Sequence, residues 1–344
     1  MPKKIKIGWI GSGFVGQVAH LYSYSQIPSA NIVALAELRQ DLGFRVANKF
    51  NIKKLYNNHS ELLENEKDLD AIVLIVRRHH TALLAKEILK KNINLFTEKP
   101  MAPNLSIAKS LTNLAIKKNL HYVIGNMRRH DDGVKYTKKI FSNFLLNKEL
   151  GDFISYRSYC YAGGDYCNID GYLKTKEKNF IGKKSPIAPN WIKKDQKKQF
   201  EKFHNYFVHN INIINYYFNY KVKVYKKILQ KNGGSILFDH NSFYGQFDFA
   251  YLNSNIWEEG IDFYFTNGHI NLKLPPAFLR NQASSLTIYN GNSNSYYQPR
   301  FDWNWSFKNQ AESFIKTLNK NETNICDARF SINDLKIIED IWKI

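Results

Sequence analysis

The sequence has few cysteines, no long apolar run and a shortage of acidic residues, and each shortage excludes a class of protein. Three cysteines in 344 residues, Cys160, Cys167 and Cys326, provide no disulfide framework. No apolar stretch reaches the roughly 20 residues that a membrane-spanning helix needs, so we expect no membrane partner. The first apolar run is typical of a strand and not of a signal peptide, which predicts a cytoplasmic protein.

Acidic residues are outnumbered by basic ones, 30 against 49, which gives a formal net charge of +19. A nucleic-acid-binding protein would gather its lysines on one helix or stripe, whereas these are spread along the chain. We therefore expect no nucleic acid partner. We attribute the charge to a composition rich in Lys, Asn and Ile, and to attraction of an anionic substrate.

The most informative segment lies near the N-terminus. Residues 5–10 form an apolar strand that leads into Gly11-Ser12-Gly13-Phe14-Val15-Gly16 and then into a helix. In this context the three glycines are a dinucleotide-binding fingerprint. Gly11 permits the tight turn, Gly13 lets a pyrophosphate approach the backbone, and Gly16 allows close helix packing. We expect a dinucleotide cofactor.

A second apolar strand, residues 31–36, indicates which dinucleotide is bound. It ends on Glu37, whose carboxylate would accept hydrogen bonds from the adenosine ribose and repel a 2′-phosphate. Arg39 favours the opposite preference, because a guanidinium could pair with that phosphate. We expect NAD, with NADP as the alternative, and we include Phe14 and Val15 among the cofactor-binding residues.

Strand and helix patterns alternate through the first 125 residues, as in a doubly wound parallel sheet. Further strands are expected at 69–76, 93–97 and 120–125, with helices at 81–91 and 104–118. After a helix at 132–146, long alternating strands follow at 153–161, 221–230, 242–251, 256–265 and 269–274. The fold class is therefore α/β. It combines an N-terminal Rossmann domain over 1–125 with a substrate-binding and oligomerisation α+β domain over 126–344, built on a large, mostly antiparallel open sheet. A final helix at 331–344 is a candidate for packing back on the first domain.

The tripeptide Glu98-Lys99-Pro100 follows the strand expected at 93–97, at the edge where open α/β sheets bind their ligands. Together with the glycine turn, the run Gly125-Asn126-Met127-Arg128-Arg129-His130-Asp131 and residues 307–314, it makes the chain resemble the Gfo/Idh/MocA family. This family is named for glucose-fructose oxidoreductase, inositol dehydrogenase and a rhizopine-catabolism protein. The resemblance implies an NAD(P)-dependent oxidoreductase, assembled as a homodimer or homotetramer, with Glu98 and Lys99 beside the cofactor.

In that family, the lysine of the tripeptide and an Asp-x-x-x-His pair on a helix of the second domain surround the substrate carbon. Lys99 matches the lysine and His209 matches the histidine, but Asn205 stands where aspartate is usual. The resemblance implies that His209 takes the proton and that Lys99 stabilises the developing alkoxide. Asn205 can orient a substrate but cannot ionise, so a Lys-Asp-His relay cannot operate unchanged. The alternative for His209 is a core histidine on an apolar helix.

Several other side chains are candidates for substrate binding. Arg128 and Arg129 could clamp a carboxylate or phosphate bidentately, or could form a solvated pair. Asn212 shares the helix face of His209. The insertion at 162–199, which carries Trp191, is a candidate substrate lid because long irregular loops are often functional.

The run Arg77-Arg78-His79-His80 also lies at the ligand end of the sheet, and the sequence does not decide which of its members touches a ligand. No cysteine or carboxylate cluster accompanies the two histidines, so we expect no metal.

These features predict an oxidoreductase that moves a hydride between nicotinamide and a secondary hydroxyl or ketone of a sugar derivative. We expect an anionic or nucleotide-linked sugar of surface-glycan metabolism, in keeping with the basic charge. A free polyol or inositol dehydrogenase is the alternative within the enzymes, because the Arg-Arg-x-Asp run is similar to that of inositol dehydrogenases. A catalytically silent NAD-binding regulator is the alternative from another class, which Asn205 keeps open.

Overall fold

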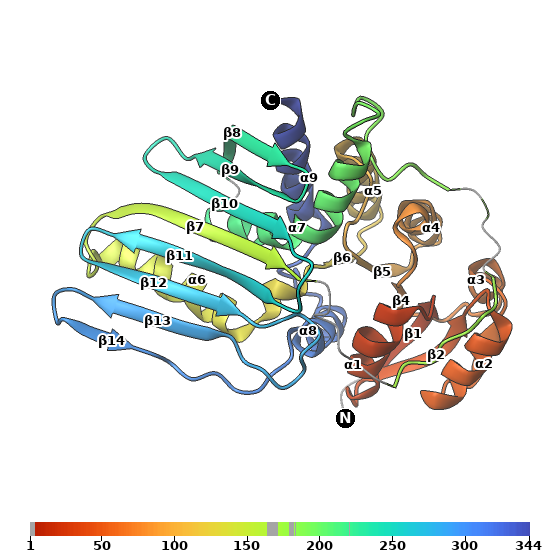
Figure 1. The fold of residues 1–344 in the computed structure, drawn as a ribbon. Coiled ribbons are helices and arrows are strands. Elements are labelled where there is room, and N and C mark those ends of the chain that lie inside the picture. Colours follow the sequence, from red (N-terminus) through yellow and green to blue (C-terminus); the bar gives the residue numbers. More distant parts are fainter. Residues whose placement is uncertain (1–3, 164–170, 179–181, 183, 220) are drawn as a thin grey trace. The chain divides into compact units, whose positions relative to one another are not determined.

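The computed structural model describes residues 4–163, 171–178, 182, 184–219 and 221–344. These residues belong to two compact units (Figure 1). The first unit contains Met1–Asn126, Ile169–Lys197 and Phe307–Leu335, and the second contains Met127–Asn168, Lys198–Ser306 and Lys336–Ile344. The chain thus leaves the first unit after Asn126 and later returns to it twice, whereas the sequence predicted two contiguous segments.

The first unit is built on a six-stranded sheet of order β3-β2-β1-β4-β5-β6, in which every neighbouring pair is parallel. Its strands are β1 (Ile5–Ile10), β2 (Ala30–Ala36), β3 (Lys54–Tyr56), β4 (Ala71–Leu74), β5 (Asn94–Glu98) and β6 (Tyr122–Gly125). Its helical elements are η1 (Gly16–Leu21), α1 (Tyr22–Ser25), α2 (Gln40–Lys49), α3 (His59–Asn65), α4 (Arg78–Lys90), α5 (Leu105–Lys117) and most of α8 (Ser306–Lys320). The strand order reverses between β1 and β4, which is the point where such sheets bind ligands.

Both faces of this sheet are covered, and β4 shows how the sequence achieves this. Ile72 and Leu74 point into the apolar cluster on one face, while Ala71 and Val73 point into the cluster on the other. All four are fully buried. A strand buried on both faces needs a continuous apolar run, which is what the sequence provides here. The predicted Rossmann domain is confirmed.

The second unit is built on an eight-stranded sheet of order β14-β13-β12-β11-β7-β10-β9-β8. Its strands are β7 (Phe153–Ala162), β8 (Lys223–Gln230), β9 (Gly233–Asp239), β10 (Tyr244–Tyr251), β11 (Trp257–Phe265), β12 (Gly268–Leu274), β13 (Ser285–Asn290) and β14 (Ser295–Tyr297). The neighbours β7 and β10 are parallel and all other pairs are antiparallel. The predicted mostly antiparallel sheet is confirmed.

Helices cover one face of this sheet. The short η2 (Met127–His130) leads into α6 (Asp132–Asn147), and Figure 1 shows α6 crossing behind β11–β13. α7 (Lys197–Tyr217) and the end of α9 (Ala328–Lys343) also belong to this unit. Phe247 and Phe249 of β10 are buried on the helical side, where they contact Phe207 of α7. The alternate residue Tyr244 is exposed, as the period-2 pattern predicts.

Candidate cofactor site

The glycine turn after β1 has the geometry that a pyrophosphate requires. Gly11 has a φ of +91°, and a Cβ added to it would lie 2.4 Å from the carbonyl oxygen of Ile75, so glycine is needed there. A Cβ on Gly16 would lie 3.2 Å from the carbonyl oxygen of Gly11, which reflects the close packing of the helix on the turn. A Cβ on Gly13 would have no neighbour within 4 Å. The backbone at Gly13 is therefore open to an approaching ligand.

The helix that follows the turn begins as a π-helix, η1, and continues as α1. All six residues of η1 are buried. Turns of π-helix are rare and are frequent at functional sites. The first helix therefore differs from the ordinary α-helix expected after the glycine turn, and its wider turn changes which side chains share a face.

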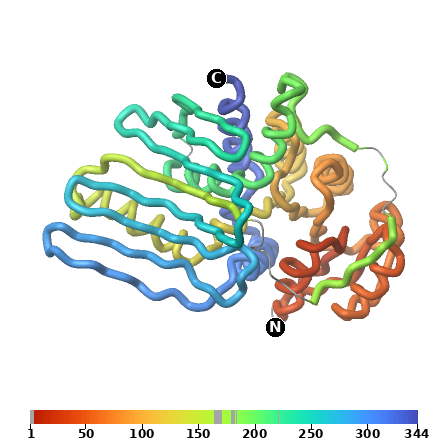
Figure 2. The backbone as a smooth tube through the Cα atoms, in the orientation of Figure 1, coloured from red at the N-terminus to blue at the C-terminus, as the bar shows by residue number. Residues whose placement is uncertain are grey.

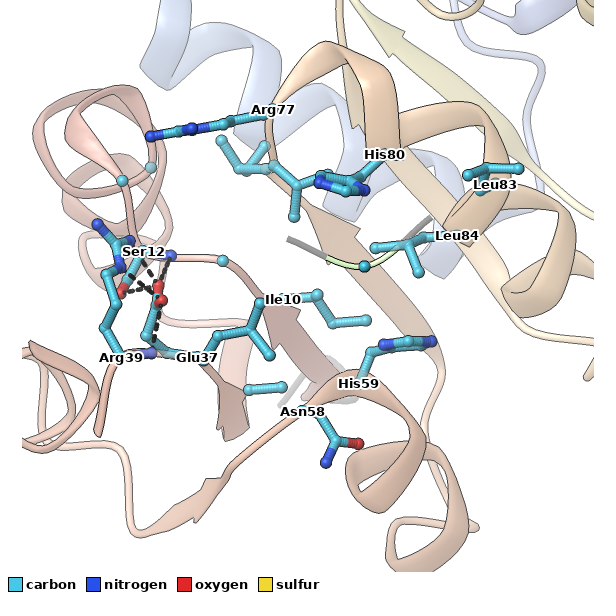
Figure 3. Close-up of a pocket in the computed structure, with 18 of the residues that line it drawn as sticks. Ile10, Ser12, Glu37, Arg39, Asn58, His59, Arg77, His80, Leu83 and Leu84 are labelled. Atoms are coloured by element: carbon cyan, nitrogen blue, oxygen red, sulfur yellow. Dashed lines mark hydrogen bonds and ion pairs between the residues drawn. The ribbon is translucent and has the colours of Figure 1, made fainter. Parts of the chain in front are cut away.

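A cavity of about 830 Å³ lies at the carboxyl ends of β1, β2 and β4, within the first unit (Figure 3). This volume lies in the range of small-molecule and cofactor pockets. Its lining contains these predicted cofactor-binding residues: Gly11, Gly13, Phe14, Val15, Gly16, Glu37 and Arg39. The structure therefore brings the glycine turn and the end of β2 together around one pocket.

Glu37 lies 5% exposed at one side of this pocket, with its carboxylate held by two neighbours (Figure 3). Ser12 donates its backbone N–H at 2.8 Å and its hydroxyl at 2.7 Å. Arg39 donates Nε at 2.8 Å, Nη2 at 2.9 Å and its backbone N–H at 3.1 Å. Burial would raise the pKa of Glu37, but the hydrogen bonds and charge of Arg39 and the bonds from Ser12 lower it overall. In the sequence, Glu37 favoured NAD and Arg39 favoured NADP. In the structure the two side chains form one ion pair.

The opposite side of the pocket is formed by the start of α4. Its lining shows which residues of the run at 77–80 face the pocket. Arg77 and His80 line the pocket, together with Leu83 and Leu84 (Figure 3). His79 is not part of that lining, and its backbone carbonyl accepts a hydrogen bond from the N–H of Ser185 at 2.9 Å. The lining of the pocket thus combines two cationic residues, Arg39 and Arg77, with the apolar side chains of Leu83 and Leu84. This arrangement suits a phosphorylated ligand with an aromatic base.

Glu98 and Lys99 lie at the end of β5, two strands from β1 in the sheet. The carboxylate of Glu98 accepts the backbone N–H of Lys99 at 3.0 Å and contacts Nε2 of His20 at 2.7 Å. His20 is a residue that the sequence analysis missed. It lies 78 positions from Glu98 in the chain, and the only signal was its place on the first helix after the glycine turn.

Part of the predicted substrate lid belongs to the first unit and contacts the glycine turn and α2. Leu173 exchanges two hydrogen bonds with the side-chain amide of Gln17, at 2.8 and 3.0 Å, and that amide also donates to the carbonyl of Ser12 in the glycine turn. Glu177 accepts the N–H groups of Asp41 and Leu42 at the start of α2, both at 3.1 Å. Figure 2 shows this stretch running beside α2.

Other residues of the insertion group in the same way. Tyr172 packs edge-on against Phe14, with ring centroids 4.9 Å apart. Gly182 contributes to the pocket lining. Trp191 is 45% exposed and is grouped with the first unit. Residues 164–170, 179–181 and 183 of the predicted insertion lie outside the described residues. The described insertion therefore contacts the cofactor unit, and its role toward a substrate stays a prediction.

The predicted catalytic pair lies on α7, in the second unit. Asn205 and His209 are half-buried and one turn apart, so they share a face of the helix. Lys99 belongs to the first unit. Their joint action therefore stays a prediction.

Both arginines of the predicted anion clamp have protein partners within the second unit. Arg128 forms a bidentate pair with Glu259, and both side chains are buried. Arg129 donates to the side-chain oxygen of Asn212 at 2.7 Å and lies over the ring of Tyr216, 5.1 Å from its centroid. Glu259 follows in sequence by 131 positions, so no local pattern identified it. Both arginines are buried and paired, so they are not a solvated pair, and their role toward an anionic substrate stays a prediction.

The described part of the chain contains neither a metal-ligand cluster nor a membrane-spanning helix. No group of three His, Cys, Asp or Glu side chains is placed to hold a metal ion in the residues that the structure describes. None of the described helices is both long and apolar enough to cross a membrane.

Comparisons with known proteins place this geometry in context. Residues 5–126 match the model of the Gfo/Idh/MocA family, described as "Oxidoreductase family, NAD-binding Rossmann fold". The inositol 2-dehydrogenase/D-chiro-inositol 3-dehydrogenase of Lacticaseibacillus casei is 29% identical over 150 residues, 42% of each chain. The myo-inositol 2-dehydrogenase of Thermotoga maritima is 25% identical over 167 residues, 48% of this chain and 49% of the relative. The matches therefore span less than half the length of these curated relatives.

Solved structures are similar over almost the whole chain. The 3-ketoreductase KijD10 from Actinomadura kijaniata, in complex with NADP and TDP-benzene, aligns with a TM-score of 0.76 and 14% identity, covering 98% of this chain and 97% of that one. An oxidoreductase from Agrobacterium radiobacter, in complex with NAD+, L-tartaric acid and magnesium, aligns with a TM-score of 0.75 and 15% identity, covering 99% and 96%. At these identities the similarity establishes the fold.

Proposed function

Through residues 5–126 the chain belongs to the Gfo/Idh/MocA oxidoreductase family, and from this premise we propose that it is an NAD(P)-dependent oxidoreductase acting on a CH–OH group of a sugar derivative. The observation that carries the proposal is the first unit's ligand edge. There the open backbone at Gly13, the Glu37 carboxylate and the Lys99 tripeptide all lie at the carboxyl ends of one parallel sheet. A dinucleotide bound across such an edge spans from β2 toward β5.

The residues present fit a dinucleotide. The turn at Gly13 and the N-terminus of the first helix would hold the pyrophosphate, and Glu37 would accept the adenosine ribose hydroxyls. The apolar side chains Leu83 and Leu84 would contact the base. When bound, the nicotinamide supplies the hydride acceptor or donor. NAD is the proposed cofactor and NADP the alternative, because Arg39 lies beside Glu37.

The chain's own residues would handle the substrate oxygen and its proton. We assign Lys99 to the hydroxyl oxygen, where an ammonium group stabilises developing alkoxide charge. His209 takes the proton during oxidation, and Asn205 orients the substrate through hydrogen bonds that need no ionisation. These roles come from the family resemblance and from the shared face of α7.

The proposal extends to the class of substrate. The net charge of +19 favours an anionic or nucleotide-linked sugar, and the structural neighbour KijD10 is in complex with a TDP-containing ligand. Two observations favour the free polyol alternative. Arg128 and Arg129 are engaged by Glu259 and Asn212, and the curated relatives are inositol dehydrogenases.

A substrate panel tests this function. The purified full chain is incubated with NAD or NADP and with free polyols, inositols, acidic sugars and nucleotide-linked sugars, while absorbance at the NADH wavelength is followed. The corresponding ketones are tested with the reduced cofactors. Turnover of any sugar or polyol supports the oxidoreductase, and the fastest substrate decides between the two classes. Binding of NAD without turnover of any compound in either direction would favour the silent regulator.

We also propose that the protein forms a homodimer or homotetramer through the sheet face of the second unit that carries Tyr244. Tyr244 is 59% exposed, and Tyr296 is 66% exposed. Light scattering coupled to size-exclusion chromatography tests this assembly. A monomeric mass at micromolar concentration would contradict it.

A further inference from the structure

A buried histidine on the π-helix is joined to the tripeptide that carries Lys99. His20 is fully buried, and its Nε2 lies 2.7 Å from a carboxylate oxygen of Glu98. The other carboxylate oxygen of Glu98 accepts the backbone N–H of Lys99 at 3.0 Å. Glu98 therefore bridges the first helix and the peptide group of Lys99.

Two phenylalanine rings pack against His20. Its ring packs edge-on against Phe96 and Phe307, each at 5.4 Å between centroids. Its Nδ1 is buried and has no hydrogen-bond partner among the described residues. A phenylalanine or leucine would fill such a site without the cost of burying polar atoms. The imidazole is therefore explained by its bond to Glu98, in which Nε2–H donates and the carboxylate accepts.

The opposite side of Glu98 is shaped to hold the same carboxylate. Glu98 pairs in register with Gly125 of β6, and a Cβ on Gly125 would lie 2.8 Å from a carboxylate oxygen of Glu98. The missing side chain at Gly125 leaves the space that the carboxylate occupies. The Glu98 carboxylate is thus held by hydrogen bonds from His20 and from the backbone N–H of Lys99, and it fits in the space beside Gly125.

From this arrangement we propose that His20 is a positioning residue for Lys99, acting through Glu98. The inference rests on the proposed function for the role of Lys99, but the geometry itself lies within one unit. Without the imidazole, Glu98 loses the anchor that fixes its rotamer, and the peptide group at Lys99 loses a fixed acceptor. A misplacement of about 1 Å at a reacting group costs about 100-fold in rate.

Two substitutions separate positioning from packing. His20→Leu introduces an apolar side chain of similar bulk and removes the hydrogen-bond donor. His20→Gln keeps an N–H that can occupy the place of Nε2. We expect His20→Leu to lower kcat by about 10- to 100-fold, with the Kd for NAD changed by less than about twofold. His20→Gln should recover most of kcat. In a Lys99→Ala background, His20→Leu should have no further effect on the residual rate, because residues that act through one another are not additive.

A second measurement needs no cofactor and no turnover. Hydrogen exchange followed by mass spectrometry reports on the amide of Lys99, which donates to Glu98. We expect faster exchange in the peptide containing Lys99 for His20→Leu and for Gly125→Ala, and near wild-type exchange for His20→Gln. The matched control is His121→Leu, because His121 is also a first-unit histidine with a 2.8 Å contact through Nε2, to Asn321, and lies outside the pocket lining.

The two proposals fail separately. If wild type turns over no compound of the panel, the proposed function fails, while the exchange measurement still decides whether His20 holds the peptide at Lys99. Unchanged exchange and unchanged kcat in His20→Leu would overturn the positioning role. It would also be overturned if His20→Gln were as impaired as His20→Leu, or if in both variants kcat and the melting temperature fell while the Kd for NAD rose. If His20→Leu does not fold, His20→Gln and Gly125→Ala keep the exchange test decisive.

Discussion

Removing the guanidinium of Arg39 should change which dinucleotide the pocket prefers. The Glu37 carboxylate accepts two hydrogen bonds from Ser12 and three from Arg39. A carboxylate offers about four lone-pair sites, so none is left for the ribose of NAD. The ribose hydroxyls must therefore displace Arg39 from at least one oxygen. Arg39→Ala removes that competitor and leaves Ser12 and the backbone N–H of residue 39 in place.

The magnitude follows from the bonds exchanged. A hydrogen bond to a charged group is worth about 1.5–3 kcal/mol when shielded from water, but the Arg39 side chain is 19% exposed, so we take the lower end. NAD should bind Arg39→Ala about tenfold more tightly than wild type. NADP should bind about tenfold more weakly, because its 2′-phosphate loses a guanidinium partner and meets an unpaired Glu37. The preference for NAD over NADP should thus rise about 100-fold.

Isothermal titration calorimetry with each cofactor measures both affinities. The matched control is Arg45→Ala on α2, because Arg45 forms a similar two-bond pair with Asp41, at 3.0 and 2.7 Å, and lies outside the pocket lining. Arg45→Ala should change neither affinity. Equal weakening of NAD and NADP in Arg39→Ala would refute the reasoning, since it would mean that Arg39 stacks on the base without competing for Glu37.

Three further predictions concern catalysis and stability. Lys99→Ala should lower turnover by at least about 100-fold while NAD binding by calorimetry stays unchanged, and full activity in this variant would remove Lys99 from the mechanism. His209→Ala should also lose activity, and the wild-type oxidation rate should rise with pH through the ordinary histidine range, about 6.5. A flat pH profile together with an active His209→Ala variant would mean that His209 is a structural histidine and not the proton acceptor. Burial, with the charges of Lys135 and Arg129, lowers the pKa of His130 to about 3. Between the unfolded value of about 6.5 and that value, only the unfolded chain binds the proton, so the free energy of unfolding should fall as pH falls, by up to roughly 1.4 kcal/mol per pH unit. Urea denaturation at pH 7, 6 and 5 should show a shallower dependence for His130→Gln than for wild type, and equal slopes would contradict the assignment.

Local sequence patterns predicted the features that depend on neighbouring residues. The glycine turn, the apolar run of β4 and the alternation of β10 are each determined by residues a few positions apart, so periodicity and glycine spacing were enough. The strands β3 and β14 were missed because each has only three residues, and β9 was missed because it begins in glycines that also indicate a turn. The six-residue β13 was missed as well. The π-helix at Gly16–Leu21 has no sequence pattern that distinguishes it from an α-helix.

The site was predicted less completely, because its contacts join distant parts of the chain. The sequence identified Glu37 and Arg39 but not their pairing, which depends on side-chain orientation. It identified Arg128 as a candidate anion ligand but not its pairing with Glu259, which lies 131 positions away. The bond between His20 and Glu98 and that between Gln17 and Leu173 also cross long stretches. Such contacts form only when the fold brings distant residues together, so local patterns in a single sequence do not predict them.

The central claim, that a dinucleotide binds at the glycine turn, is tested most directly by placing a side chain at Gly13. The Cβ position there has no neighbour within 4 Å and no left-handed φ, so Gly13→Leu should fold with a wild-type melting temperature. The leucine would occupy the space where the pyrophosphate must approach. Fluorescence titration with NADH should show saturable binding to wild type and none to Gly13→Leu. Equal NADH binding by a folded Gly13→Leu protein would contradict the account.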